Sequence, residues 1–260
     1  MKRVVFNQKG GVGKSTITCN LAAISAERGR STLVIDLDPQ GNSSRYLLGA
    51  GVDKLEMTAA GLFEQMLGFK LRPTPTSDFI VSTRFSGLHV LPAHAALDDL
   101  QGKLEAKHKI YKLKEAIDAL RDYDEIWIDT APALNFYTLS ALIAADTCLI
   151  PFDCDDFSRR ALYHLLDSVK EIQADHNDEL EVEGIIVNQF QPRANLPQQL
   201  VAELRDEGLP VLNTRLSSSI KIKESHQQSQ PMIHYDSKHK LTQEYGDLFD
   251  ELEAGLSARH

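Results

Sequence analysis

Short, continuously apolar runs alternate along this chain with longer segments in which apolar residues recur every three or four positions. Runs such as Leu33–Ile35 and Ile126–Ile128 contain no polar residue. Strands that are covered on both faces of a parallel sheet have this composition. The expected strands cover residues 3–7, 32–36, 79–82, 88–91, 125–129, 147–151 and 183–188, with a shorter strand near residue 211.

The segments between these runs have the periodicity of helices that bury one face. The first places Ile17, Leu21 and Ile24 on one side, and the last repeats apolar residues at i, i+4, i+7 and i+11. The expected helices cover residues 15–28, 104–121, 134–145, 157–174, 196–207 and 241–258. Residues 49–83 are the least regular, and Pro73-Thr74-Pro75 indicates an exposed loop.

This alternation predicts an α/β fold: a doubly wound, mainly parallel sheet with helices on both faces and ligands at the carboxyl ends of the strands. The chain has 260 residues, 42% of them hydrophobic, which suits a single domain over residues 1–260. Its three cysteines form no metal-binding spacing, and no apolar stretch approaches the ~20 residues that span a bilayer. The net charge of −9 argues against wholesale coating of nucleic acid.

The segment after the first apolar run carries the most specific chemistry. A glycine-rich loop leads into Lys14 and Ser15, where the first helix is expected to begin. Backbone N–H groups of such a loop bind phosphate oxygens, Lys14 is expected to reach the β- and γ-phosphates, and Ser15 is expected to bind Mg²⁺. Gln8 replaces the first glycine of the general G-x-x-x-x-G-K-[ST] pattern, so the loop is a deviant form. The expected nucleotide-binding residues here are Gly10, Gly11, Val12, Gly13, Lys14, Ser15 and Thr16.

The run from Lys9 to Thr16 resembles the deviant Walker A motif of the ParA/MinD family of ATPases. In that family the front lysine reaches across a nucleotide-sandwich dimer to the phosphates of the partner's ATP, so the resemblance implies this nucleotide-binding and catalytic role for Lys9. A cation from a second subunit would neutralise charge on the transferred phosphoryl group. The resemblance also implies ATP and Mg²⁺ as cofactors, a homodimer on ATP binding, a catalytic role for Lys14, and ATP hydrolysis with slow intrinsic turnover.

Three aspartates follow apolar strands, where this fold places its ligands. Mg²⁺ bound to phosphates keeps several waters, and these need carboxylate acceptors. The resemblance implies that Asp36 and Asp129 hold the Mg²⁺ shell together with Ser15, and that Asp38 orients the attacking water in a catalytic role. Taken alone, Asp38 before a proline is also typical of a turn or a helix cap. Residues 130–132 would begin a switch loop that responds to the γ-phosphate.

Another apolar strand ends at Asn188. A side-chain amide can both donate to and accept from an adenine ring, and the resemblance implies such a cofactor contact for Asn188. A cap on the following turn remains the alternative.

Residues 213–240 hold five lysines and arginines against two acidic residues. Positive charge gathered in this way binds phosphate backbones even in an acidic protein. The resemblance implies nonspecific DNA binding by the ATP dimer, with Arg193, Lys221 and Lys223 as the expected contacts. Arg159-Arg160 is a further basic pair at a helix start, where it departs from the small and acidic residues expected in the family. Solvated surface charge is the alternative for each. The histidines of this segment fit no zinc spacing and are predicted to lie at the surface: His226, His234 and His239.

Other branches of the family fit less well. The last helix has an acidic polar face, which anionic lipid would repel, so no stable membrane insertion is expected. Cys148 and Cys154 do not match an iron–sulfur site, and the early start of the first strand argues against an N-terminal helix-turn-helix domain. The expected protein is a small ParA-like ATPase, cytoplasmic and nucleoid-associated, that positions a plasmid, chromosome region or protein complex.

Hydrolysis in such a protein would be stimulated by a ParB-like or other cargo adaptor. The alternative is an ATP-dependent switch that acts on a protein or membrane partner without binding DNA. A metabolic P-loop enzyme is a third hypothesis, for which no substrate pocket is evident in the sequence.

Overall fold

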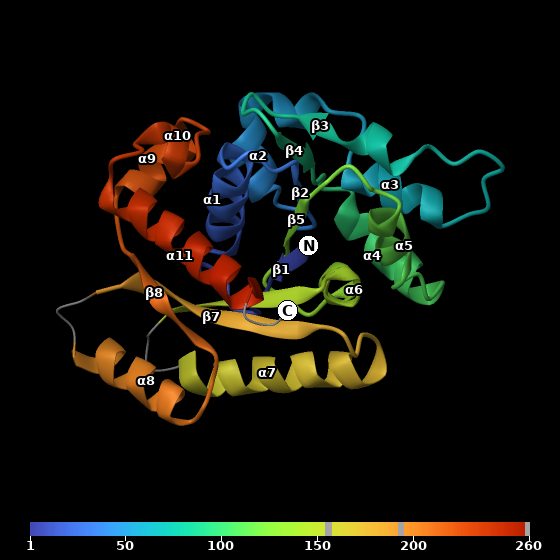
Figure 1. The fold of residues 1–260 in the computed structure, drawn as a ribbon. Helices are drawn as coiled ribbons and strands as arrows, with labels where there is room; N and C mark the ends of the chain where they lie inside the picture. The colour runs from blue at the N-terminus through green and yellow to red at the C-terminus, as the bar shows by residue number, and fades with distance from the viewer. Residues whose placement is uncertain (154–157, 192–194, 258–260) are drawn as a thin grey trace.

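An eight-stranded sheet forms the centre of the computed structural model, which describes residues 1–153, 158–191 and 195–257 (Figure 1). The strand order is β3-β4-β2-β5-β1-β6-β7-β8, and all neighbouring pairs are parallel except β3 with β4. This confirms the predicted fold class. The strands are β1 Lys2–Val5, β2 Thr32–Asp36, β3 Val81–Ser82, β4 Leu88–Leu91, β5 Glu125–Asp129, β6 Thr147–Asp153, β7 Glu181–Phe190 and β8 Val211–Ser217.

Helices cover both faces of the sheet. One face packs against α1, α2, α10 and α11, and the other against α3 to α8. The α-helices are α1 Lys14–Glu27, α2 Asn42–Leu48, α3 Ala59–Met66, α4 Leu97–Ala106, α5 Lys112–Asp118, α6 Phe136–Ala144, α7 Ser158–Asp175, α8 Asn195–Asp206, α9 Lys221–Gln227, α10 Met232–Tyr235 and α11 Lys240–Ser257. Two 3₁₀ helices are η1 Gly49–Lys54 and η2 Thr76–Phe79.

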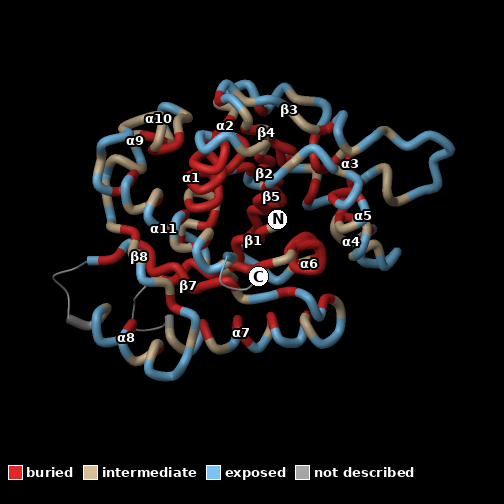
Figure 2. Tube along the Cα trace, viewed as in Figure 1, coloured by how far each residue is buried: buried red, intermediate tan, exposed pale blue. Residues whose placement is uncertain are grey.

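The apolar runs of the strands supply both hydrophobic cores at once. Successive strand residues point to opposite faces, so Leu33 and Ile35 enter the core under α3 to α8 while Val34 enters the core under α1 and α11. In the same way, Ile126 enters the core under α3 to α8 and Trp127 enters the core under α1 and α11. Figure 2 shows this double burial as an almost continuous red centre. A strand that needs apolar residues on both faces cannot alternate with polar ones.

Three local predictions were wrong or incomplete. A single helix over 104–121 is replaced by α4 and α5, because the chain turns at 107–111 and His108 has a φ of 51°. The strand expected over 79–82 is reduced to β3, since Phe79 belongs to η2. The irregular segment 49–83 contains α3 and both 3₁₀ helices, although 73–75 does lie in a loop. Residues 157 and 258, predicted as helix ends, lie outside the described residues.

Candidate functional site

The glycine-rich loop connects β1, in the middle of the sheet, to the first turn of α1. Gly13 stands directly before α1 with a φ of 91°, a conformation that L side chains rarely adopt. A Cβ at this position would lie 2.4 Å from Nδ2 of Asn188. Glycine is therefore required here both by the backbone conformation and by the close approach of β7.

Two side chains at the end of β7 brace this loop. Asn188 donates from Nδ2 to the carbonyl of Val12 at 2.9 Å, and Gln189 donates from Nε2 to the carbonyl of Gly11 at 3.0 Å. Gln189 has a φ of 54°, a strained conformation for a residue with a side chain. Sequence analysis did not identify Gln189, whose only signal is its place after Asn188 at a strand end. In this structure the Asn188 amide nitrogen contacts the loop backbone, while its expected contact with adenine remains a prediction.

Asp36 and Asp129 face each other at the carboxyl ends of β2 and β5, where they are register partners. Both are fully buried. Asp36 accepts hydrogen bonds from the backbone N–H and the hydroxyl of Ser44, at 2.8 and 2.7 Å. Asp129 accepts from the hydroxyl of Ser43 at 2.7 Å and also from Ser15. Ser43 and Ser44 were not predicted as site residues, although they lie on α2 only a few positions after Asp38.

The electrostatics of this pair are unusual for carboxylates. Burial and the neighbouring Asp129 raise the pKa of Asp36 to about 8. Burial also raises the pKa of Asp129 to about 6, although Ser15 and Ser43 act in the opposite direction. Burial lowers the pKa of Lys14, against the opposing effect of Asp129 and Asp38. Lys14 thus faces Asp129 and Asp38, and with Asp36 beside them the carboxylates of the site outnumber its one buried ammonium group.

These residues fit a magnesium–nucleotide complex. Oδ1 of Asp129 is buried and has no hydrogen-bond partner among the described residues. The described part of the chain contains no group of three carboxylate, histidine or cysteine ligands. Mg²⁺ is suited to such a place, because it usually takes one or two carboxylates and completes its shell with water and substrate phosphates. Ser15 hydrogen-bonds Asp129, while their expected roles at a shared metal site remain a prediction.

The remaining predicted catalytic residues lie around the same loop. Asp38 is buried just beyond β2, where it accepts a hydrogen bond from the Gln40 N–H at 3.0 Å. Lys14 donates from Nζ to the carbonyl of Lys9 at 3.2 Å. The Lys9 ammonium lies elsewhere: its Nζ is 4.0 Å from Oδ2 of Asp153 at the end of β6, and its side chain is 40% exposed. Lys9 and Lys14 thus share one loop but present their charges to different surroundings.

The basic residues expected to contact DNA have different surroundings. Lys221 pairs with Glu224 at 2.8 Å, and its ammonium lies 5.7 Å from the centre of the Tyr235 ring. Lys223 is exposed on the same helix, α9. Arg159 pairs with Glu203 of α8 and with Glu207 directly after it, which connects α7 to the end of α8. Arg193 lies outside the described residues.

The prediction that His226 and His234 are surface histidines was wrong. The His226 ring is half-buried and stacks on Tyr46 at 3.8 Å between ring centres, and its Nε2 lies 3.0 Å from Oγ1 of Thr16. The sequence shows these histidines only as isolated polar residues, because their partners lie about 150 or more positions away. His226 thus joins α9 to the phosphate-binding loop.

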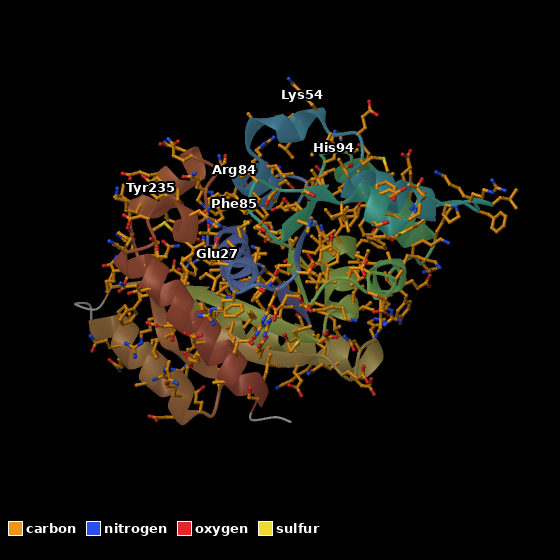
Figure 3. The ribbon with its side chains drawn as sticks, turned by 45° about the horizontal axis from the view of Figure 1, so that its top comes forward. Glu27, Lys54, Arg84, Phe85, His94 and Tyr235 are labelled. Atoms are coloured by element: carbon orange, nitrogen blue, oxygen red, sulfur yellow. The ribbon has the colours of Figure 1, made fainter. Side chains whose placement is uncertain are left out.

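His234 is also half-buried and stacks on Phe85, with its Nδ1 3.5 Å from Glu27. Glu27 and Phe85, the two partners of His234, are labelled in Figure 3. Burial lowers the pKa of both His226 and His234. Both therefore serve the packing of the C-terminal segment on α1. Across the described residues, no helix is both long and apolar enough to cross a membrane.

Comparison with known proteins places this site in context. The sequence profile described as "AAA domain" matches residues 2–182. The chain is 31% identical to the chromosome partitioning protein ParA of Caulobacter vibrioides, over 95% of this chain and 92% of that protein. It is also 31% identical to the sporulation initiation inhibitor protein Soj of Bacillus subtilis, over 96% of this chain and 97% of that protein.

A crystal structure described as cobyrinic acid a,c-diamide synthase from Mycobacterium smegmatis, with a bound ATP analog and magnesium, superposes with a TM-score of 0.84. It is 26% identical, and the match covers 100% of this chain and 96% of that one. The fold of the whole described chain is therefore that of a nucleotide-binding protein.

Proposed function

The chain belongs to the ParA family of P-loop ATPases, and from that premise we propose that it is an ATPase that positions or segregates a cargo. In this proposal ATP closes a sandwich dimer, the dimer binds nonspecific DNA of the nucleoid, and an adaptor on the cargo stimulates hydrolysis. The observation that carries the proposal is the pair of lysines on one loop. Lys14 lies inside a buried acidic site, whereas the ammonium of Lys9 is turned toward the surface.

The nucleotide part of the proposal rests on the buried site. The N–H groups of the glycine-rich loop and of the first turn of α1 would bind the phosphates, and Lys14 would add its charge. Ser15, Asp36 and Asp129 would hold Mg²⁺, which would neutralise negative charge on the phosphates. The unpaired Oδ1 of Asp129 and the raised pKa of Asp36 are both consistent with an added cation. Asp38, buried beside Lys14, would orient the attacking water.

The two-subunit part of the proposal rests on Lys9. Its side chain is 40% exposed and faces Asp153, which is 33% exposed. A pair this open contributes little stability, because solvent screens it. A phosphate bound in a second copy would offer Lys9 a stronger partner than Asp153, since it carries more charge and would be less hydrated in the dimer. Because Lys9 would leave Asp153 for a phosphate of the second copy's ATP, the dimer would depend on ATP.

The DNA part of the proposal rests on α9. Lys221 and Lys223 lie on this helix, and His226 connects the same helix to Thr16 of the nucleotide loop. A change at the loop on ATP binding would therefore be transmitted directly to the basic residues. Arg193 is proposed as a further contact on sequence grounds alone.

A second candidate function is a switch that acts on a protein or membrane partner and never binds DNA. It is favoured by the pairing of Lys221 with Glu224 and Tyr235, which occupies that ammonium group. Salt distinguishes the two functions. Binding to a DNA backbone weakens steeply between ~50 and ~200 mM salt, whereas a mainly apolar protein interface does not.

The test is retention of the full-length protein on immobilised nonspecific duplex DNA with ATP or ADP. The expected result is retention with ATP only, lost in Lys221→Ala/Lys223→Ala and steeply salt-dependent. Lys170→Ala, an exposed lysine on α7, is the matched control and should bind normally. Equal retention with ATP and ADP, or full retention by the double variant, would remove DNA from the proposal.

A further inference from the structure

The segment between α3 and η2 forms an arm, residues 66–73, that projects from the body of the protein. It is the cyan excursion that stands away from the helices in Figures 1 and 3. Two hydrogen bonds hold its ends together. Gln65 donates from Nε2 to the carbonyl of Thr74 and accepts from the Thr74 N–H, both at 3.0 Å. The arm is therefore a closed loop with a fixed base, of the compact kind that is often functional.

The tip of this arm is apolar and almost completely open to solvent. Phe69 is 92% exposed and Leu71 is 90% exposed, while the other large exposed apolar residues range from 36% to 64%. The residues at its base behave differently, since Met66 and Leu67 pack against the hydrophobic core. Phe69 and Leu71 add nothing to that core. Two large, exposed apolar side chains that lie two positions apart on one arm indicate a contact surface.

Positive charge surrounds this tip. Lys70 alternates with Phe69 and Leu71 along the arm, and Arg72 follows. Lys107 donates from Nζ to the carbonyl of Leu67 at 2.7 Å, so the end of α4 lies against the base of the arm. A groove of about 840 Å³ separates the arm from α5, and its lining includes four basic and two acidic residues: Lys70, Lys109, Lys112, Arg121, Glu115 and Asp122.

We propose that this arm binds an anionic lipid surface. Phe69 and Leu71 enter the boundary between headgroups and acyl chains, and the surrounding lysines and arginines contact lipid phosphates. Apolar side chains that reach below a ring of cations have the arrangement that binds peripheral proteins to anionic membranes, where burial and electrostatic attraction add together. Because the whole chain has a net charge of −9, a local excess of basic residues at this tip is stronger evidence for an anionic partner.

The apolar tip favours a lipid surface over DNA. A phosphate backbone is bound by cations and gains nothing from Leu71, since an aliphatic side chain does not pair with phosphate and does not stack on bases as an aromatic ring does. The proposal goes beyond the proposed function and is independent of it. The arm shares no residue with the nucleotide site or with α9.

The first experiment measures cosedimentation of the full-length protein with vesicles. One set contains equal parts of phosphatidylglycerol and phosphatidylcholine, and the other contains phosphatidylcholine alone. We expect binding to the anionic vesicles to be about tenfold tighter. Phe69→Ser/Leu71→Ser should weaken it by about tenfold or more, because the buried apolar area is lost. Met57→Ser, which removes a 36% exposed apolar side chain elsewhere, is the matched control and should bind as the wild type does.

A second measurement locates the tip directly. In Phe69→Trp the introduced indole should shift its emission to shorter wavelength on anionic vesicles and be quenched by brominated lipid. The native Trp127 is fully buried in the sheet and gives a constant background. Equal binding to both vesicle types, wild-type binding by the serine variant, or an emission shift caused by duplex DNA and not by vesicles would each overturn the proposal.

Discussion

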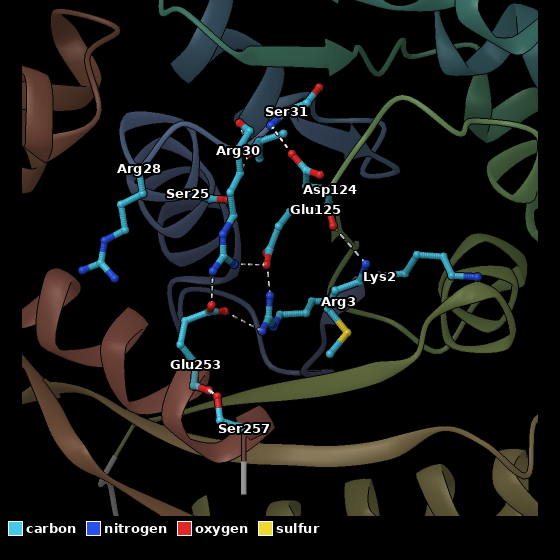
Figure 4. A network of polar contacts seen from close by, with 12 residues as sticks. Lys2, Arg3, Ser25, Arg28, Arg30, Ser31, Asp124, Glu125, Glu253 and Ser257 are labelled. Atoms are coloured by element: carbon cyan, nitrogen blue, oxygen red, sulfur yellow. Dashed lines mark hydrogen bonds and ion pairs between the residues drawn. The ribbon is translucent and has the colours of Figure 1, made fainter. Parts of the chain in front are cut away.

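Among the described residues, buried charged groups lie at both the amino ends and the carboxyl ends of the strands, but only at the amino ends do they pair with groups of opposite charge. There the Arg3 guanidinium pairs with Glu125 at 2.5 Å (Figure 4). It also pairs with Glu183 at 2.9 Å, and all three side chains are at most 3% exposed. Arg30 and Glu253 extend the network to α1's end and to α11. At the carboxyl end, Asp36 and Asp129 face each other with hydroxyl and amide donors and one ammonium group nearby.

This difference distinguishes charged groups that stabilise the fold from charged groups that are expected to serve a functional site. Burial alone would lower the pKa of Arg3, but Glu183 and Glu125 together raise it, so this arginine stays charged between two carboxylates, although its Nη2 has no hydrogen-bond partner among the described residues. The pKa of Asp36 is instead raised to about 8 by burial and by Asp129. A buried cluster that keeps like charges together is poorly stabilised by the protein alone, and such clusters concentrate at functional sites. Removing charge should therefore have opposite effects at the two ends.

The largest effect is expected at the amino end. Arg3→Leu leaves Glu125 and Glu183 buried without their shared partner, and loss of one member of a buried ion pair costs about 3–5 kcal/mol. Urea denaturation of the nucleotide-free protein measures this loss. Arg28→Leu is the control, since Arg28 pairs with Asp250 at an exposed site and should change stability little. Equal losses in the two variants would contradict the description of buried, oppositely charged pairs.

Asp129→Asn should have the opposite effect on stability. Removing one of two facing carboxylates should raise the free energy of unfolding without ligand by about 1 kcal/mol. Magnesium-dependent ATP binding, measured by calorimetry, should weaken on the order of a hundredfold because a metal-shell acceptor is lost. Asp53→Asn, at an exposed aspartate, should change neither quantity. A destabilised variant with intact ATP binding would make Asp129 a structural residue like Arg3.

The two ends should also differ in their response to pH. Between pH 6 and 8 the folded protein keeps a proton on Asp36, while an unfolded chain with an ordinary pKa of 3.8 does not. The unfolded state then binds fewer protons, so the free energy of unfolding should fall as pH rises, by about 1.4 kcal/mol per pH unit. Urea denaturation at pH 7, 7.5 and 8 should show a fall in the wild type and in Arg28→Leu, because the buried His226 and His234, whose pKa values are lowered, oppose it mainly below pH 7.

The slope should disappear in Asp36→Asn, and Mg²⁺ with ATP should also reduce it. Glu183 and Glu125 raise the pKa of Arg3, so this arginine stays charged in this range and contributes no slope. Stability that rises between pH 7 and 8 in the wild type would contradict a raised Asp36 pKa.

The smallest effect is expected at the brace of the glycine-rich loop. Gln189→Ala removes one exposed hydrogen bond to the Gly11 carbonyl, and such a bond contributes about 0.5–1.5 kcal/mol. ATP affinity should therefore fall only about two- to tenfold, with stability unchanged. Gln199→Ala removes a comparable exposed bond on α8 and should leave ATP affinity as it is. Unchanged affinity in Gln189→Ala would mean that the loop keeps its shape without this brace.

The sequence predicts the centre of the fold well and its polar partners poorly. Strands such as β2 and β5 are evident because burial on both faces demands unbroken apolar runs, and a strand end fixes where Asp36 and Asp129 lie. The glycine-rich loop is equally local. Its glycines and Lys14 are consecutive in the chain, so their spacing alone predicts their chemistry.

Contacts between distant segments were not predictable in this way. Ser43 reaches Asp129 across 86 positions, and His226 reaches Thr16 across 210. Serine and histidine are common at surfaces, so nothing in their own neighbourhood distinguishes them. The division of 104–121 into two helices has a similar origin, because tertiary packing outweighs local helix propensity there.

The central claim is that the carboxyl-end site is half of an active site and that a second copy completes it through Lys9. The direct test is the molar mass, by light scattering, of the wild type and of Lys9→Ala with saturating ATP and Mg²⁺. The wild type should have twice the mass of one chain, and Lys9→Ala should keep the mass of one chain while still binding ATP. A Lys9→Ala protein that dimerises with ATP as the wild type does would contradict the claim.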